Sequence, residues 1–165
     1  MANPSDKLPP LHLEGQWLLG EAFSVPEDQD DHEAWIEAYV NLALALATQP
    51  PTEAERAEAR RECEVTDHHE RESGTVWTKF NHSGASGLRR PRELLKQVRC
   101  PAVVVHAAKD QVFPMEHGEA LRDDIERAML VVLKDCGHEL PHRVRSRVVD
   151  AILTNAKKGA ASRCC

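Results

Sequence analysis

The spacing of apolar residues divides the chain into a mainly helical first part and an alternating strand–helix second part. Residues 1–26 are rich in proline and lack a regular period, so we expect an irregular lead-in. From Asp30 or Asp31 onward, large apolar residues recur every three or four positions, which predicts an amphipathic helix. Pro50 and Pro51 end that helix.

A second helix is predicted directly after these prolines. Thr52 and Glu55 have the spacing of a capping box, which opens helices. The segment is strongly charged up to about Glu72, and its few small apolar residues predict only a thin buried stripe. Residues 73–90 contain three glycines and are expected to form a loop or a short helix, and residues 92–98 a short helical turn.

After Pro101 the pattern changes to short apolar runs. Val103-Val104-Val105 is typical of a strand buried in a parallel sheet, and Leu130-Val131-Val132-Leu133 is a second such run. Pro114 suits the first position of an intervening helix that runs to about Arg127. A last amphipathic helix is marked by Val144, Val148, Ile152 and Leu153. The order strand, helix, strand, helix predicts a right-handed βαβ unit followed by a covering helix.

Each predicted strand is followed by a polar residue able to do chemistry. Asp110 follows the first strand and His138 the second, and the carboxyl ends of parallel strands lie at one edge of a sheet. A carboxylate that accepts the Nδ1–H of an imidazole fixes its tautomer, while the other nitrogen takes a proton from a nucleophile. Asp110 and His138 are therefore candidate catalytic residues; the alternative for His138 is a structural histidine in a loop.

These two segments resemble a known family. Residues 95–114, including Pro101-Ala-Val-Val-Val-His-Ala-Ala-Lys-Asp110, resemble the penultimate strand and acid loop of α/β-hydrolase enzymes, and residues 116–141 resemble the next segment of the same family. The spacing of about 28 residues between acid and histidine fits this family too. The resemblance implies that Asp110 is the triad acid and His138 the triad base. Ala107 departs from the family's usual glycine at the turn before the acid loop.

The branch that the chain resembles most is that of the esterases which include the aclacinomycin methylesterases. Those enzymes have a helical cap just before this strand, and the predicted helices before residue 90 resemble it. The resemblance implies an α/β fold class, a partial α/β-hydrolase fold in which a helical cap precedes the last two parallel strands and their helices. The implied division is a cap-like region with its lead-in at 1–90, a C-terminal βαβα portion at 91–157, and a disordered tail at 158–165.

The nucleophile of such a triad has no clear counterpart in the sequence. The family places its serine in a strained Gly-x-Ser-x-Gly elbow between a strand and a helix. The nearest string, Gly84-Ala85-Ser86-Gly87-Leu88, has leucine for the second glycine and follows no apolar strand. Cys136 lies two residues from His138 on one loop, which is poor geometry for attack, and we expect a small buried cysteine. The chain alone is therefore expected to be inactive on esters.

Composition narrows the function classes further. The 165 residues carry a formal charge of −6, which argues against a nucleic-acid-binding surface. No apolar stretch approaches the eighteen or so residues of a membrane span, and the N-terminus lacks a secretory signal pattern. Five cysteines without such a signal fit free thiols in a reducing compartment, so we expect a cytoplasmic protein. Cys164-Cys165 resembles a prenylated terminus, but a ragged tail is the preferred interpretation.

Other polar and aromatic clusters are weaker candidates. Asp67-His68-His69-Glu70 has metal-ligating residue types, but neighbours on a helix do not face one another, so a solvated face is preferred and no metal or cofactor is expected. His106 and His117 are expected to be structural. The tryptophans either line a substrate pocket or pack a core, and packing is preferred for all three: Trp17, Trp35 and Trp77.

Two functions from different classes are consistent with these patterns. The first is an α/β-hydrolase-like protein derived from a serine esterase, acting on a small ester or related acyl substrate once a nucleophile-bearing half is supplied. The second is a non-catalytic remnant or interaction module, which self-associates or pairs with such a half because an unpaired strand edge is a template for pairing. A dimer in which two fragments complete one sheet is a variant of the second.

Overall fold

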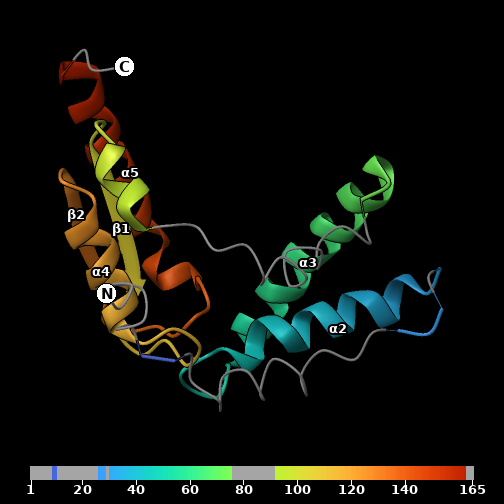
Figure 1. The fold of residues 1–165 in the computed structure, drawn as a ribbon. Helices are drawn as coiled ribbons and strands as arrows, with labels where there is room; N and C mark the ends of the chain where they lie inside the picture. Colours follow the sequence, from blue (N-terminus) through green and yellow to red (C-terminus); the bar gives the residue numbers. More distant parts are fainter. Residues whose placement is uncertain (1–8, 11–25, 29, 76–91, 163–165) are drawn as a thin grey trace. The chain divides into compact units, whose positions relative to one another are not determined.

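The computed structural model describes most of the chain as two compact units (Figure 1). One unit is formed by residues 26–28 and 30–75, and the other by residues 92–162 together with Pro9 and Pro10. The predicted loop at 76–90, with Ser86, lies outside the described residues, as does most of the lead-in before residue 26. In the described residues no helix has both the length and the apolar character needed to cross a membrane.

The first unit is a pair of helices whose ends follow the predicted capping residues. Helix α2 (His32–Ala45) begins after Asp31, whose side chain accepts a hydrogen bond from the Ala34 N–H at 2.9 Å. Helix α3 (Glu53–Ser73) begins with the predicted capping box: the Thr52 Oγ1 atom accepts from the Glu55 N–H at 3.2 Å, and the Glu55 carboxylate accepts from the Thr52 N–H at 2.9 Å. Both predicted helix starts are confirmed.

Helix α3 ends at a glycine because its last turn requires an unusual backbone conformation. Gly74 adopts a φ of 66°, in the left-handed region that glycine enters without a side-chain clash. Its N–H and that of Thr75 reach back to carbonyl groups of the last turn, so the exposed helix carbonyls are partly satisfied.

The two helices contribute unequally to the buried part of this unit. The large buried side chains come from α2 and the residue that caps its end: Trp35, Ile36, Tyr39, Val40 and Leu46. Of the residues of α3, only Asp67 is buried, at 3% exposure. The expectation that Asp67 belongs to a solvated face is therefore wrong. Its carboxylate is held by the His32 Nδ1 atom at 3.0 Å and the Arg71 Nε atom at 2.9 Å, and these partners make burial of a charge tolerable.

The second unit has the predicted order of strands and helices. Its elements are η3 (Arg92–Gln97), β1 (Ala102–Ala107), α4 (Met115–Asp124), β2 (Ala128–Leu133) and α5 (His142–Ser162). Strands β1 and β2 pair in parallel, with Ala102 opposite Ala128 and Ala107 opposite Leu133. In the described part of the chain this sheet has two strands, whereas independent stability usually needs three or more.

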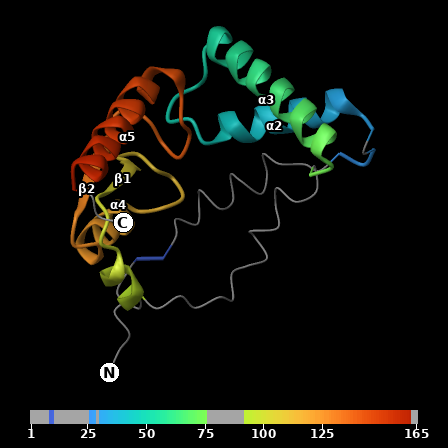
Figure 2. The same ribbon diagram turned by 90° about the horizontal axis from the view of Figure 1, so that it is seen from above.

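The alternation of side chains along β1 places α4 and α5 on opposite faces of the sheet (Figure 2). Ala107 and Leu133 join Cys136 and Val144 of the α5 side in a buried apolar cluster. His106, one residue earlier in β1, lies against Gly118 of α4 on the other face. The core of this unit is therefore the layer between the sheet and α5.

Four helix boundaries differ from the prediction. Helix α2 ends at Ala45, before the prolines expected to stop it. Pro114 is the N-cap of α4, one position before the expected first helical residue, and α4 ends at Asp124 and not near Arg127. Helix α5 continues to Ser162, so the tail predicted at 158–165 begins inside a helix. The reason is that alanines and lysines near its end favour helix and Gly159 alone does not stop it.

Candidate functional site

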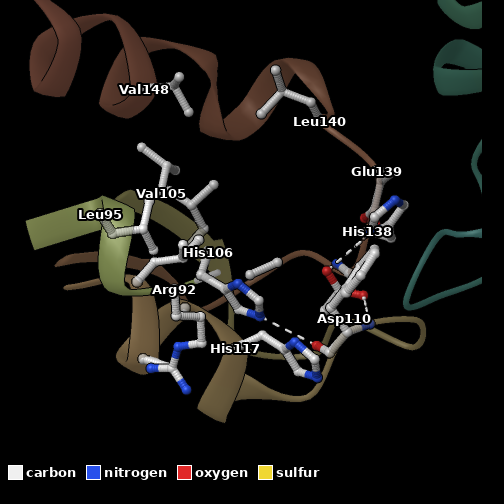
Figure 3. Close-up of a pocket in the computed structure, with 17 residues that line it drawn as sticks. Arg92, Leu95, Val105, His106, Asp110, His117, His138, Glu139, Leu140 and Val148 are labelled. Atoms are coloured by element: carbon white, nitrogen blue, oxygen red, sulfur yellow. Dashed lines mark hydrogen bonds and ion pairs between the residues drawn. The ribbon is translucent and has the colours of Figure 1, made fainter. Parts of the chain in front are cut away.

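Asp110 and His138 lie together beyond the carboxyl ends of β1 and β2 (Figure 3). The His138 Nδ1 atom is 3.0 Å from the Asp110 Oδ2 atom. Because an ionised carboxylate can only accept, the imidazole donates its Nδ1–H, which leaves Nε2 as the proton acceptor. Nε2 makes no hydrogen bond to the described residues, and the His138 side chain is 36% exposed. The geometry is that of a carboxylate orienting a histidine base.

Asp110 is fixed by the loop that it begins. Its Oδ1 atom accepts hydrogen bonds from the Val112 and Phe113 N–H groups, both at 2.8 Å. Burial alone would raise the pKa of this carboxyl, but the hydrogen bonds from His138 and from the two N–H groups outweigh burial and lower the pKa below its usual value. Asp110 is therefore ionised at neutral pH, as an orienting carboxylate must be.

Backbone hydrogen bonds join the loop of the acid to the loop of the histidine. The Ala108 N–H donates to the Leu133 carbonyl at 2.8 Å, and the Lys109 N–H donates to the Cys136 carbonyl at 3.3 Å. Ala107, at the position where the enzymes that this segment resembles usually have glycine, is the last residue of β1 and part of the buried cluster. Alanine at position 107 does not turn Asp110 away from His138.

The loop that carries the histidine is held by the first turn of α5. The Arg143 guanidinium donates to the Asp135 carbonyl at 3.1 and 2.8 Å and to the Glu139 carboxylate at 3.2 Å. Glu139 in turn accepts from the Gly137 N–H at 2.7 Å. The sequence analysis did not predict these hydrogen bonds of Arg143 and Glu139 around His138. The spacing of four residues between Glu139 and Arg143 is a signal that could have indicated them.

An aromatic ring lies against the histidine. The Phe113 ring stacks on the His138 ring, with centroids 5.5 Å apart and an interplanar angle of 29°. The edge-on contact of Phe113 with His117 has a centroid distance of 5.7 Å. Phe113 thus restricts the rotation of the imidazole in addition to binding the carboxylate through its N–H.

An open pocket extends from this pair along β1. It has a volume of about 560 Å³ and is bordered by η3, β1, α4 and α5 (Figure 3). Asp110 and His138 line one end. The remaining wall is mainly apolar and includes Leu95, Val105, Leu121, Leu140 and Val148. Such a pocket suits an uncharged small molecule placed beside the imidazole.

The other candidates contribute little chemistry. Cys136 is fully buried, and burial, followed by the charge of Glu139, raises the pKa of its thiol, so the expectation of an unreactive buried cysteine is confirmed. Ser86, Trp17 and Trp77 lie outside the described residues, whereas Trp35 is buried as predicted. Within the described part of the chain, no group of three acidic, histidine or cysteine side chains is arranged to hold a metal ion.

Comparison with known proteins shows the fold to which this site belongs. An esterase from Rhodococcus sp. ECU1013 aligns with a TM-score of 0.55 at 18% identity, over 91% of this chain and 50% of its own. An esterase from Exiguobacterium antarcticum aligns with a TM-score of 0.52 at 18% identity, over 87% and 47% of the two chains. The 2-hydroxy-6-oxo-6-phenylhexa-2,4-dienoate hydrolase of Rhodococcus sp. strain RHA1 gives 0.51 at 19% identity, over 74% and 44%.

These likenesses define the fold of the chain. The chain has a partial α/β-hydrolase fold, and it spans about half the length of the solved structures that it matches. No family model matches the sequence. The predicted fold class is therefore confirmed, while the resemblance to the aclacinomycin methylesterase branch stays a prediction.

Proposed function

We propose that this chain supplies the acid, the base and one wall of the substrate pocket of a serine-hydrolase site for small ester or related acyl compounds. The observation that carries the proposal is the 3.0 Å contact between the His138 Nδ1 atom and the Asp110 Oδ2 atom, next to an open apolar pocket. The names of two similar structures, both esterases, support the ester class.

In the proposed reaction His138 moves the proton. Its Nε2 atom takes the hydroxyl proton of a nucleophile as the nucleophile attacks the acyl carbon, and Asp110 stabilises the resulting imidazolium. His138 then gives the proton to the leaving group, and the cycle repeats with water as the attacking group. The nucleophile and the oxyanion donors come from a further segment, which a longer chain or a partner provides.

The test is turnover of p-nitrophenyl acetate by the 165-residue chain and by a form completed with a segment that carries a Gly-x-Ser-x-Gly elbow. We expect no turnover by the chain alone, since the described residues place no nucleophile beside Asp110 and His138 and the sequence has no Gly-x-Ser-x-Gly elbow. The completed form should turn over the ester, and His138→Ala should reduce the rate by about 10³-fold or more. His68→Ala, at an exposed histidine of α3, is the matched control and should leave the rate unchanged. Turnover by the chain alone that survives His138→Ala would contradict the proposal.

A second candidate function is supported by the exposed apolar surface of the C-terminal unit. About half of each side chain is exposed at Val149, Ile152 and Leu153 of α5. Together with the two-stranded sheet, this surface favours an interaction module that pairs with another polypeptide or with itself. Sedimentation across a wide concentration range tests it, because a compact monomer at all concentrations would argue against self-association.

A further inference from the structure

His106 occupies a confined place behind the candidate acid–base pair. It lies in β1 on the face covered by α4, and its Nε2 atom is 3.2 Å from the Phe113 carbonyl oxygen. A carbonyl oxygen can only accept, so His106 donates its Nε2–H in this contact. The hydrogen bond therefore fixes both the tautomer of His106 and the position of the Phe113 peptide.

Gly118 of α4 makes the room in which the His106 ring sits. A Cβ atom at Gly118 would lie 2.8 Å from the His106 Cγ atom and 2.9 Å from its Nδ1 atom, closer than real Cβ contacts. Glycine inside a helix costs about 1 kcal/mol relative to alanine, so its presence there needs a reason. The close approach of His106 supplies that reason.

Phe113 connects His106 to both members of the pair. Its carbonyl accepts from His106, its N–H donates to the Asp110 Oδ1 atom at 2.8 Å, and its ring stacks on His138. A shift of this one residue would therefore loosen the carboxylate and the imidazole together. Sequence reasoning assigned His106 only a general structural role.

We propose that His106, seated against Gly118, is a positioning residue that holds Phe113 and through it the geometry of Asp110 and His138. Its importance for catalysis rests on the proposed function, but the positioning itself is a property of this chain. The hydrogen bond from His106 restrains the Phe113 carbonyl, and with it the loop after Asp110. Proton transfer requires a carboxylate–imidazole pair that is already in position.

The experiment is a pH titration by NMR of the Asp110 carboxyl carbon in the full 165-residue chain, with the ring nitrogens of His138 followed in parallel. His106→Phe keeps a ring in the site and removes the donor. The expected result is a rise in the pKa of Asp110, because the hydrogen bonds from the Val112 and Phe113 N–H groups are weakened, together with a changed Nδ1 signal of His138. His106→Gln presents an amide N–H at matching reach and should restore the wild-type values.

Substitution of Gly118 tests the position of the His106 ring from the α4 side. Gly118→Ala should displace the His106 ring and shift Asp110 in the same direction as His106→Phe. Gly159→Ala is the matched control, since nothing lies within 4 Å of a Cβ atom placed there, and it should change neither signal. If His106→Phe disturbs the whole spectrum, the comparison of His106→Gln with the shorter His106→Asn decides instead.

Unchanged Asp110 and His138 signals in a folded His106→Phe chain would overturn the positioning role, as would equal behaviour of the glutamine and asparagine variants. This readout is independent of turnover. If the completed chain has no esterase activity, the proposed function is disproved and the titration result is unaffected. If the completed chain is active but the Asp110 titration is the same in His106→Phe as in the wild type, only the role of His106 is disproved.

Discussion

The two units of the chain are stabilised in different ways, although both contain a histidine bound to an aspartate. In the helical unit, α2 supplies most of the large buried side chains and α3 supplies the single buried carboxylate of Asp67. In the C-terminal unit, two strands, a loop and α5 share one apolar cluster, and backbone hydrogen bonds tie the loops together. The difference shows that the helical unit combines an apolar face of α2 with one buried ionic group, whereas the C-terminal unit combines its apolar cluster with backbone hydrogen bonds between loops.

The exposed ion pairs of the helical unit add little to the pairing of α2 with α3. Arg60 bonds to Glu33 at 2.7 Å and Arg56 bonds to Glu37, but all four side chains are at least one-third exposed. Pairs in such positions contribute little because water screens the charges and the long side chains lose freedom. Among the polar groups between α2 and α3, Asp67 is the buried one, and the part-buried Tyr39 hydroxyl adds a hydrogen bond to the Glu70 carboxylate at 3.3 Å.

The largest effect is expected in the apolar cluster of the C-terminal unit. Leu133→Ala removes a side chain that is almost fully buried and should lower the free energy of unfolding by about 3 kcal/mol, through lost transfer energy and a cavity. Urea denaturation measures the loss, and hydrogen exchange should place it in β1, β2 and α5 and leave α2 and α3 protected. Equal deprotection of α2 and α3 would contradict the separation of the units.

A somewhat smaller effect is expected from the buried carboxylate of the helical unit. Asp67→Ala leaves Arg71 and His32 without their anion and should cost about 2 kcal/mol, less than a fully buried pair because the His32 side chain is mostly exposed. Hydrogen exchange should now show opening of α2 and α3 alone. His68→Ala, next to it on the exposed side of α3, should change stability by less than about 0.5 kcal/mol. Similar losses for both variants would show that α3 has no special contact at Asp67.

The smallest effect is expected in the pH dependence of the C-terminal unit. The pKa of Asp110 is lowered in the folded chain, so its ionised form adds stability above the unfolded value near 4, and that stability is lost as the pH falls through the folded pKa. Urea midpoints at pH 6 and pH 3 should therefore differ less in Asp110→Asn than in the wild-type chain. An unchanged difference would mean that Asp110 gains nothing from its hydrogen bonds in the folded state.

The sequence predicted the elements well where local rules decide them. Asp31, Thr52 and Pro114 each mark a helix start to within one residue, because capping and backbone restriction act over a single turn. The contact between Asp110 and His138 was also predictable from sequence, since parallel strands bring their following loops to one edge, whereas their catalytic role stays a prediction. That Phe113 stacks on His138 was not predictable, because the contact joins side chains of two loops that are 25 positions apart in the sequence.

Burial of Asp67 is where the structure departs most from the sequence pattern. The many charged residues of α3 indicate a solvated helix face, yet Asp67 lies four residues after Cys63 and eight after Ala59, both of which are partly buried. The helical period thus places Asp67 on the thin inner stripe of α3. Which polar residue on such a stripe is buried depends on a partner in another helix, here His32, and that partner is not visible from the period.

The short path of chain between Asp110 and His138 has a kinetic consequence. The two residues are 28 positions apart and are joined by one strand–helix–strand crossover, so the pair needs no contact with a distant part of the sequence. Contacts of low sequence separation form early, because little loop entropy is lost when they close. We therefore expect the carboxylate and imidazole to come together in the first stages of folding, before any remote segment reaches the edge of the sheet.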